Sequence, residues 1–66
     1  MKFSEALKGL ADAGHEAIRD PDGTELEIFA MLSDADENGD DWALDAEGIE
    51  RLEDGEPSGY RYTVIA

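Results

Sequence analysis

The sequence predicts a small α+β domain in which an N-terminal helix covers a small antiparallel sheet. Three observations lead to this prediction: an amphipathic N-terminal stretch, a turn motif followed by alternating residues, and a C-terminal stretch rich in β-branched and aromatic residues. A chain of 66 residues without cysteine is expected to form one domain over residues 1–66, with no disulfide to support it. The core of so short a chain contributes only about 3–5 kcal/mol.

The N-terminal helix is expected over about residues 4–13. Apolar residues recur at helical spacing from Phe3 to Ala11, and charged residues occupy the other face. Ser4 suits the N-cap, and Gly14 suits the position just after the last helical turn. The helix therefore has a signal at both ends.

A β-hairpin is expected over about residues 15–32. Its turn is Asp20-Pro21-Asp22-Gly23, where proline at the second position and glycine at the fourth favour a type I turn. Apolar and polar residues then alternate over Glu25–Leu32, as in a half-buried strand. A helix over Glu25–Leu32 remains an alternative, because Glu, Leu and Met all favour helices.

The second half of the chain is expected to hold a loop, a short helix and a strand. The loop is Ser33–Asp41, which is polar and lacks apolar periodicity. Asp45 suits the N-cap of a short acidic helix over about residues 46–54, which Gly55 would end. A strand over about residues 59–65 follows from the β-branched and aromatic residues there.

The acidic residues are concentrated in the second half of the chain. Of the 18 acidic residues, 11 lie between Asp34 and Glu56, where Arg51 is the one basic residue, and the whole chain carries a formal net charge of −13. Such a field repels nucleic acid and acidic lipid, and it attracts basic surfaces. We therefore expect a basic protein partner, no direct binding of nucleic acid and no binding to membranes.

The sequence offers no pattern typical of an enzyme. His15 is the only histidine, and no nucleophile with a matching base can be assembled around it. No stretch is apolar enough for a signal peptide or a membrane span. We expect a monomeric, non-enzymatic protein of the cytoplasm that needs no cofactor.

Carboxylates on the expected short helix favour mimicry of nucleic acid. Those three or four residues apart lie on or near one helical face, with Cβ atoms about 5–6 Å apart. This spacing approaches that of successive phosphates along one strand, about 6–7 Å. Carboxylates of the preceding loop would extend the row. The candidate partner-binding residues are Asp34, Asp36, Glu37, Asp40, Asp41, Glu47, Glu50, Glu53 and Asp54.

The acidic charge also fits adaptation to high salt or the binding of calcium. Adaptation to high salt, with a regulatory or structural role, suits a chain that has many carboxylates and only two lysines. Calcium binding is a possibility because Asp34–Asp45 matches the first half of an EF-hand loop. The second half departs from that pattern, with Asp41 where an apolar residue is usual and Asp45 where a glutamate is usual. The candidate calcium ligands are Asp34, Asp36, Asn38, Asp40 and Asp45.

The chain resembles the small acidic inhibitors encoded by phages and mobile elements, above all the anti-CRISPR proteins that mimic DNA, and among these the type I-C inhibitors. The shared features are the small size, the lack of cysteine, the acidic block Asp34–Glu56 and the α/β order of elements. The resemblance implies a target in a host complex, namely the DNA-binding surface of a type I CRISPR surveillance complex.

A second resemblance is confined to the N-terminal part. The stretch Met1–Leu10, followed by Gly14 and a hairpin, is similar to the opening of a phage family that includes an inhibitor of Thoeris defence, which sequesters a nucleotide signal. That family usually continues with basic residues and a tryptophan, where this chain has His15-Glu16-Ala17-Ile18-Arg19-Asp20. No cationic pocket for a phosphate is therefore expected here. Both resemblances imply phage-encoded counter-defence, through different mechanisms.

Overall fold

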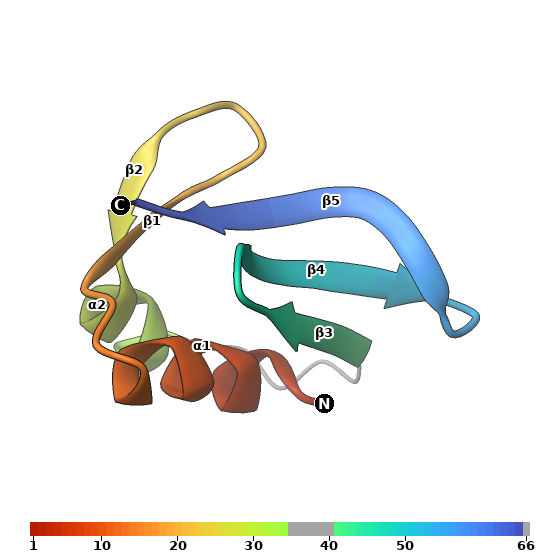
Figure 1. Cartoon of the computed structure of the whole chain (residues 1–66), viewed down its shortest axis with the longest axis horizontal. Coiled ribbons are helices and arrows are strands. Elements are labelled where there is room, and N and C mark those ends of the chain that lie inside the picture. The colour runs from red at the N-terminus through yellow and green to blue at the C-terminus, as the bar shows by residue number, and fades with distance from the viewer. Residues whose placement is uncertain (35–40, 66) are drawn as a thin grey trace.

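One antiparallel sheet of five strands and two helices packed against it make up the described part of the chain (Figure 1). The computed structural model describes residues 1–34 and 41–65. The sheet has the strand order β2-β1-β5-β4-β3, so the C-terminal strand lies at its centre. In chain order, the elements are α1 (Phe3–Asp12), β1 (Ala17–Arg19), β2 (Glu25–Glu27), α2 (Ile28–Ser33), β3 (Asp41–Asp45), β4 (Gly48–Glu53) and β5 (Glu56–Val64).

The predicted α+β class is confirmed, with an N-terminal helix against an antiparallel sheet. Helix α1 begins one residue earlier than expected, with Lys2 rather than Ser4 at the N-cap. The backbone N–H of Lys2 donates to the Glu5 carboxylate at 3.2 Å, which stabilises the first turn. At the other end, the N–H groups of Gly14 and His15 donate to carbonyls of the last turn, as in a Schellman motif.

The returning strand of the first hairpin is shorter than predicted. Strand β2 ends at Glu27, and the chain continues as helix α2. Ile28 is fully buried, whereas Phe29 is exposed, and the half-buried Met31 and Leu32 follow Ile28 at helical spacing. The residues of this stretch fit both the alternation of a strand and the periodicity of a helix. They form a helix, which packs against α1.

The predicted short helix over residues 46–54 is wrong, because this stretch forms most of the β3–β4 hairpin. The Asp45 carboxylate accepts the N–H groups of Glu47 at 2.8 Å and of Gly48 at 3.0 Å. An N-cap aspartate makes the same two contacts, so a helix start and this turn look alike over their first residues. Gly48 then adopts φ 151°, which is not helical, and the chain returns as β4.

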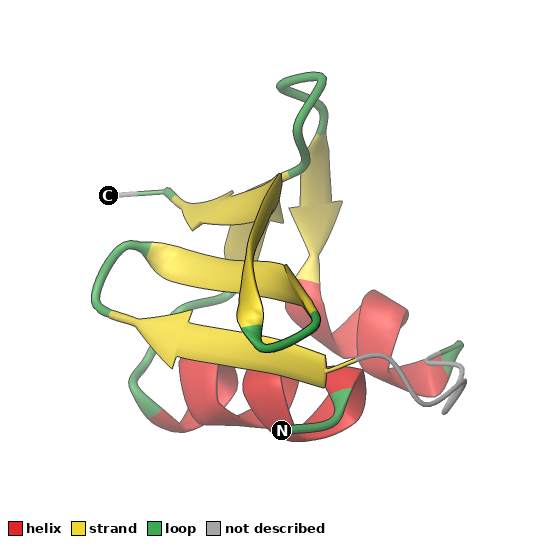
Figure 2. Ribbon diagram, turned by 90° about the vertical axis from the view of Figure 1, so that its right-hand side faces the viewer, coloured by secondary structure: helices red, strands yellow, loops and turns green. Residues whose placement is uncertain are grey.

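The core lies between the sheet and the two helices (Figure 2). On the sheet, alternate residues of each strand face α1 and α2, and the remaining ones form a face that neither helix covers. Leu44, Ile49 and Tyr62 are neighbours across β3, β4 and β5 on the face that the helices cover. Ile49, in the middle, is fully buried. The buried apolar residues are Ala6, Leu7, Leu10, Ile18, Ile28, Trp42 and Ile49.

Candidate partner-binding surface

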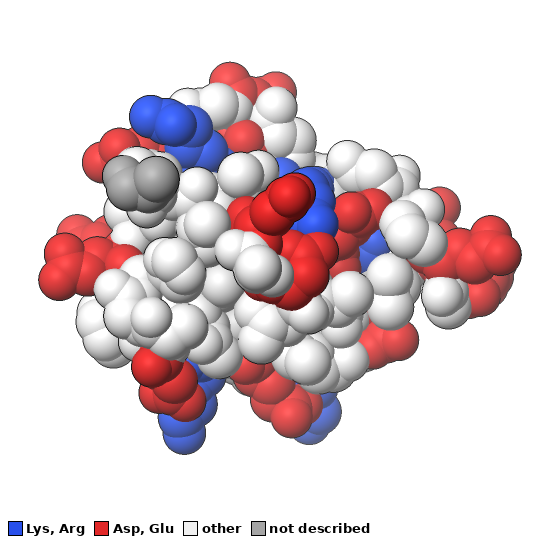
Figure 3. All heavy atoms as spheres, in the orientation of Figure 1, with Lys and Arg blue, Asp and Glu red and all other residues white. Residues whose placement is uncertain are grey.

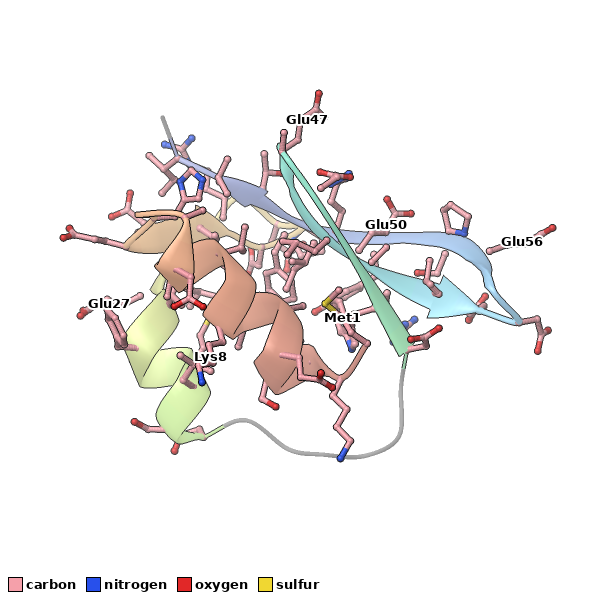
Figure 4. All side chains as sticks on the ribbon, turned by 60° about the horizontal axis from the view of Figure 1, so that its bottom comes forward. Met1, Lys8, Glu27, Glu47, Glu50 and Glu56 are labelled. Atoms are coloured by element: carbon pink, nitrogen blue, oxygen red, sulfur yellow. The ribbon has the colours of Figure 1, made fainter. Side chains whose placement is uncertain are left out.

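Within the described residues, the predicted partner-binding carboxylates lie on several elements, and no single helical face holds them. Figure 4 shows three of the carboxylates along the β3–β5 part of the sheet. Glu47 and Glu56 lie at opposite ends of this part, and Glu50 lies between them. Asp34 lies at the end of α2, and Asp41 begins β3. Asp36, Glu37, Asn38 and Asp40 lie outside the described residues. The described carboxylates therefore lie in different surroundings.

Asp41 is held by the start of the chain. Its Oδ1 lies 2.6 Å from the amino group of Met1, and the same amino group donates to the Trp42 carbonyl at 2.9 Å. The hydrogen bond and the positive charge of the amino group hold the pKa of Asp41 below its usual 3.8. Asp41 is thus exposed but already paired.

Glu50 and Asp45 both pair with one arginine. Arg61, on the neighbouring strand β5, has its Nε 3.4 Å from Glu50 Oε1, and its Nη2 pairs with Asp45 Oδ2. Glu50 also accepts the backbone N–H of Gly59 at 3.1 Å, and its side chain is only 17% exposed. These contacts tie strands β3, β4 and β5 together on the face that the helices leave uncovered. Glu50 therefore supports the sheet from β4 rather than from the expected helix, and its place among the partner-binding carboxylates stays a prediction.

The tip of the β4–β5 hairpin carries three exposed carboxylates within four residues: Glu53, Asp54 and Glu56. They flank a tight turn formed by Asp54 and Gly55, with φ 51° and φ 82°. Asp-Gly is a dipeptide that favours such turns. Glu53 and Glu56 are directly opposite each other across the two strands. Like charges in that position destabilise a hairpin.

Little positive charge reaches this tip. The nearest described cation is Arg51, whose Nη2 lies 4.0 Å from Glu53 Oε1. The Arg51 guanidinium also lies over the Tyr60 ring, 5.1 Å from its centre. In the space-filling view, acidic atoms fill the right-hand end of the molecule, where the β4–β5 hairpin projects (Figure 3). The tip is an exposed acidic projection of the described surface.

Phe3, Trp42, Tyr60 and Tyr62 form one aromatic cluster beside the core. Trp42 is 6% exposed and packs on Phe3 with ring centres 4.6 Å apart. Tyr60 and Tyr62 lie on the same face of β5 and meet edge to face. Burial and the neighbouring Tyr60 raise the pKa of Tyr62 well above its ordinary value, so its phenol stays neutral. These rings anchor the β3–β5 part of the sheet to α1.

Of the candidate calcium ligands, Asp34 and Asp45 lie within the described residues. Both Asp45 oxygens already accept hydrogen bonds, from the turn and from Arg61. A helix, α2, does precede the loop, but strand β3 follows it, whereas an EF-hand has a helix on each side. Within residues 1–34 and 41–65, no group of three or more His, Cys, Asp or Glu side chains is arranged to hold a metal ion.

Comparison of the chain with protein-family models, curated protein sequences and solved structures gives no match. In the part of the chain that the structure describes, no helix has the length and apolar character needed to cross a membrane.

Only part of the β4–β5 tip is predicted from the sequence. The sequence predicts Glu53 and Asp54 as contacts on a helix, and Glu56 is not among the candidates. A signal is present, because Asp54-Gly55 between two short polar and apolar stretches is a hairpin motif. The hairpin motif is missed because Gly55 is taken only as the end of a helix.

Proposed function

We propose that this protein is a non-enzymatic inhibitor that presents carboxylates to the DNA-binding surface of another protein. The observation that carries the proposal is the β4–β5 tip. There, Glu53 and Glu56 oppose each other and Asp54 lies between them. A hairpin gains stability from opposite charges or apolar pairs at such positions, so this arrangement costs stability. A basic partner surface would offset that cost on binding.

The charge balance of the rest of the molecule supports the proposal. Of five basic residues, Arg61 is taken up by Asp45 and Glu50, and Arg51 is shared between Tyr60 and Glu53. Both arginines are thus paired within the protein, and the formal net charge of −13 already includes all five basic residues. Affinity would come from ion pairs with lysines and arginines of the target, and it would fall as salt rises.

The target class that we propose is the type I CRISPR surveillance complex, on the strength of the resemblance to acidic anti-CRISPR proteins. This complex must hold DNA on a basic surface, which an acidic protein can occupy in its place. The proposal places the protein as a monomer in the cytoplasm of a host cell.

The proposal is tested with a purified type I-C surveillance complex and a labelled target DNA. The tip variant combines Glu53→Lys, Asp54→Asn and Glu56→Lys, because asparagine still tolerates the positive φ at position 54. We expect the parent protein to displace the DNA and the tip variant to lose most of that activity. The measurement is the fraction of DNA bound, at low and at raised salt.

A matched control carries the same change of charge at the other end of the molecule. It combines Asp12→Lys, Glu16→Lys and Asp22→Asn, all exposed residues of the α1 end and the first hairpin (Figure 1). The control should inhibit nearly as well as the parent. Equal loss in both variants would mean that only net charge matters, and undiminished inhibition by the tip variant would exclude the tip as the contact. A parent protein that leaves the DNA bound would refute the target class.

A second candidate function, a halophile-adapted domain with a regulatory or structural role, is favoured by one observation. Exposed carboxylates also occur throughout the first half of the described chain, although the sequence concentrates acid in the second half. They are Glu5, Asp12, Glu16, Asp22, Glu25 and Glu27. Far-UV circular dichroism separates the two candidates. A halophilic domain should be unfolded in dilute buffer and fold near molar potassium chloride, and a mimic should be folded in both.

A further inference from the structure

The two edges of the sheet differ in how their main-chain groups are used. At the β3 edge, the Trp42 N–H donates to the Met1 carbonyl at 2.8 Å, and the Met1 amino group donates to the Trp42 carbonyl. Met1 thus occupies part of that edge. No described segment is paired with the outer side of β2, which lies at the opposite margin of the sheet (Figure 2).

The register of the first hairpin shows which groups point outward from β2. The Asp20 N–H donates to the Thr24 carbonyl, and the Ile28 N–H donates to the Glu16 carbonyl. Leu26 is opposite Ile18, midway between these two bonded pairs. In an antiparallel ladder, every second residue directs its N–H and C=O to one neighbour. The N–H groups of Glu25 and Glu27 therefore point away from β1, toward the open edge.

The side chains along this edge favour a partner strand that is positively charged. Glu25 and Glu27 are both exposed, and they are two residues apart on one face of the strand, which separates them by about 6.5–7 Å. A second copy of the chain paired antiparallel around Leu26 would place Glu25 opposite Glu27, where like charges repel. An added strand with Lys or Arg at alternate positions would place opposite charges there instead.

We propose that the β2 edge binds an extended basic segment of a partner protein, which adds to the sheet as a further antiparallel strand. Main-chain hydrogen bonds to Glu25 and Glu27 would hold the segment, and its alternating cations would pair with the two carboxylates. Phe29 follows directly after this edge and is 61% exposed, so it offers an apolar contact to the stem of a lysine or arginine. This inference is independent of the proposed inhibition of DNA binding, because it concerns a different edge and any partner with such a segment.

Two variants at one position separate main-chain pairing from charge. Glu25→Gln removes a carboxylate and retains the outward N–H. Glu25→Pro removes both, and proline is tolerated at an edge where the N–H faces solvent. The probe is an eight-residue peptide of alternating lysine and valine, and a peptide of the same composition with all lysines first serves as the control.

We expect the alternating peptide to bind the parent more tightly than the control peptide. Glu25→Gln should weaken binding about threefold, as for an exposed ion pair. Glu25→Pro should weaken it about tenfold, since a hydrogen bond is lost as well. The Asp12/Glu16/Asp22 and Glu53/Asp54/Glu56 variants described above serve as further controls. The tip variant should bind the peptide almost as well as the parent, so this result is separate from the test of DNA displacement.

Chemical-shift mapping on the unaltered protein provides a second test, which does not depend on the folding of the proline variant. The backbone amides of Glu25 and Glu27 should shift most on addition of the alternating peptide. Equal affinity of the proline and glutamine variants, equal binding of both peptides, or shifts confined to the β4–β5 tip would overturn the inference.

Discussion

At the scale of single residues, Gly48 has the least freedom to change. It adopts φ 151°, and a Cβ built on it would lie 2.0 Å from the Tyr62 carbonyl oxygen. That oxygen belongs to the main chain of the central strand β5, so it cannot move aside without distorting the sheet. The close approach of β4 to β5 therefore depends on the absence of a side chain here.

We expect Gly48→Ala to destabilise the protein by about 3 kcal/mol, which approaches the full stability of so small a domain. Gly55→Ala is the control, because Gly55 has φ 82° but no atom within 4 Å of the built Cβ. The control should cost only about 1 kcal/mol, for the positive φ. Urea unfolding followed by Trp42 fluorescence measures both, and similar losses would contradict the packing argument.

Asp41 contributes a dependence of stability on pH. Its pKa in the folded protein lies below the usual 3.8, because the Met1 amino group donates to it. A depressed folded pKa means that the stabilisation is fully present above the unfolded pKa and is lost as pH falls through the folded one. We expect a carboxyl titration by NMR to give a midpoint for Asp41 below 3.8, and acetylation of the amino group to raise it. A midpoint at or above that value would contradict the contact.

At the scale of elements, two hairpin turns begin with aspartate and end with glycine, and the sequence signal differs between them. Asp20-Pro21-Asp22-Gly23 is predicted as a turn because proline makes the signal unambiguous. Asp45-Ala46-Glu47-Gly48 has the same aspartate and glycine three residues apart, but alanine and glutamate between them also suit a helix. Propensity therefore favours a helix, and the cross-strand pairing of β3 with β4 overrides it.

The β4–β5 hairpin should become more stable when its acidic tip is altered. Glu53→Lys places a cation opposite Glu56, where the parent has a second carboxylate. We expect the free energy of unfolding to rise by about 0.5 kcal/mol at low salt. Thermal unfolding measures the change, with Glu16→Lys, at an exposed residue outside the helices and strands, as a control for net charge alone. A lower melting temperature than that of the control would show that the two carboxylates do not repel each other in the folded protein.

At the scale of the whole molecule, the charges are close enough to interact across the fold. The radius of gyration is 10.8 Å, which is similar to the screening length of about 10 Å at 0.1 M salt. Repulsion among carboxylates on different elements therefore opposes folding in dilute buffer.

We expect the melting temperature to rise with sodium chloride between about 20 mM and about 1 M, as the screening length falls to about 3 Å. The Glu53/Asp54/Glu56 variant should show a smaller rise, because it carries less negative charge. Differential scanning calorimetry at several salt concentrations measures both slopes. A melting temperature independent of salt would mean that repulsion contributes little to the stability of this fold.

Several local features can be predicted from the sequence: helix α1, the turn of the first hairpin, the C-terminal strand and the acidic excess. Each of these depends on neighbouring residues, through apolar periodicity, turn motifs or composition. The fold, and not local propensity, places Asp45–Glu53 in a hairpin, because β4 pairs with β3 on one side and with β5 on the other. The fold also decided which carboxylates are free. Arg61 lies beside Glu50 only once β5 pairs with β4, so no local pattern could separate Glu50 from the exposed tip carboxylates Glu53, Asp54 and Glu56.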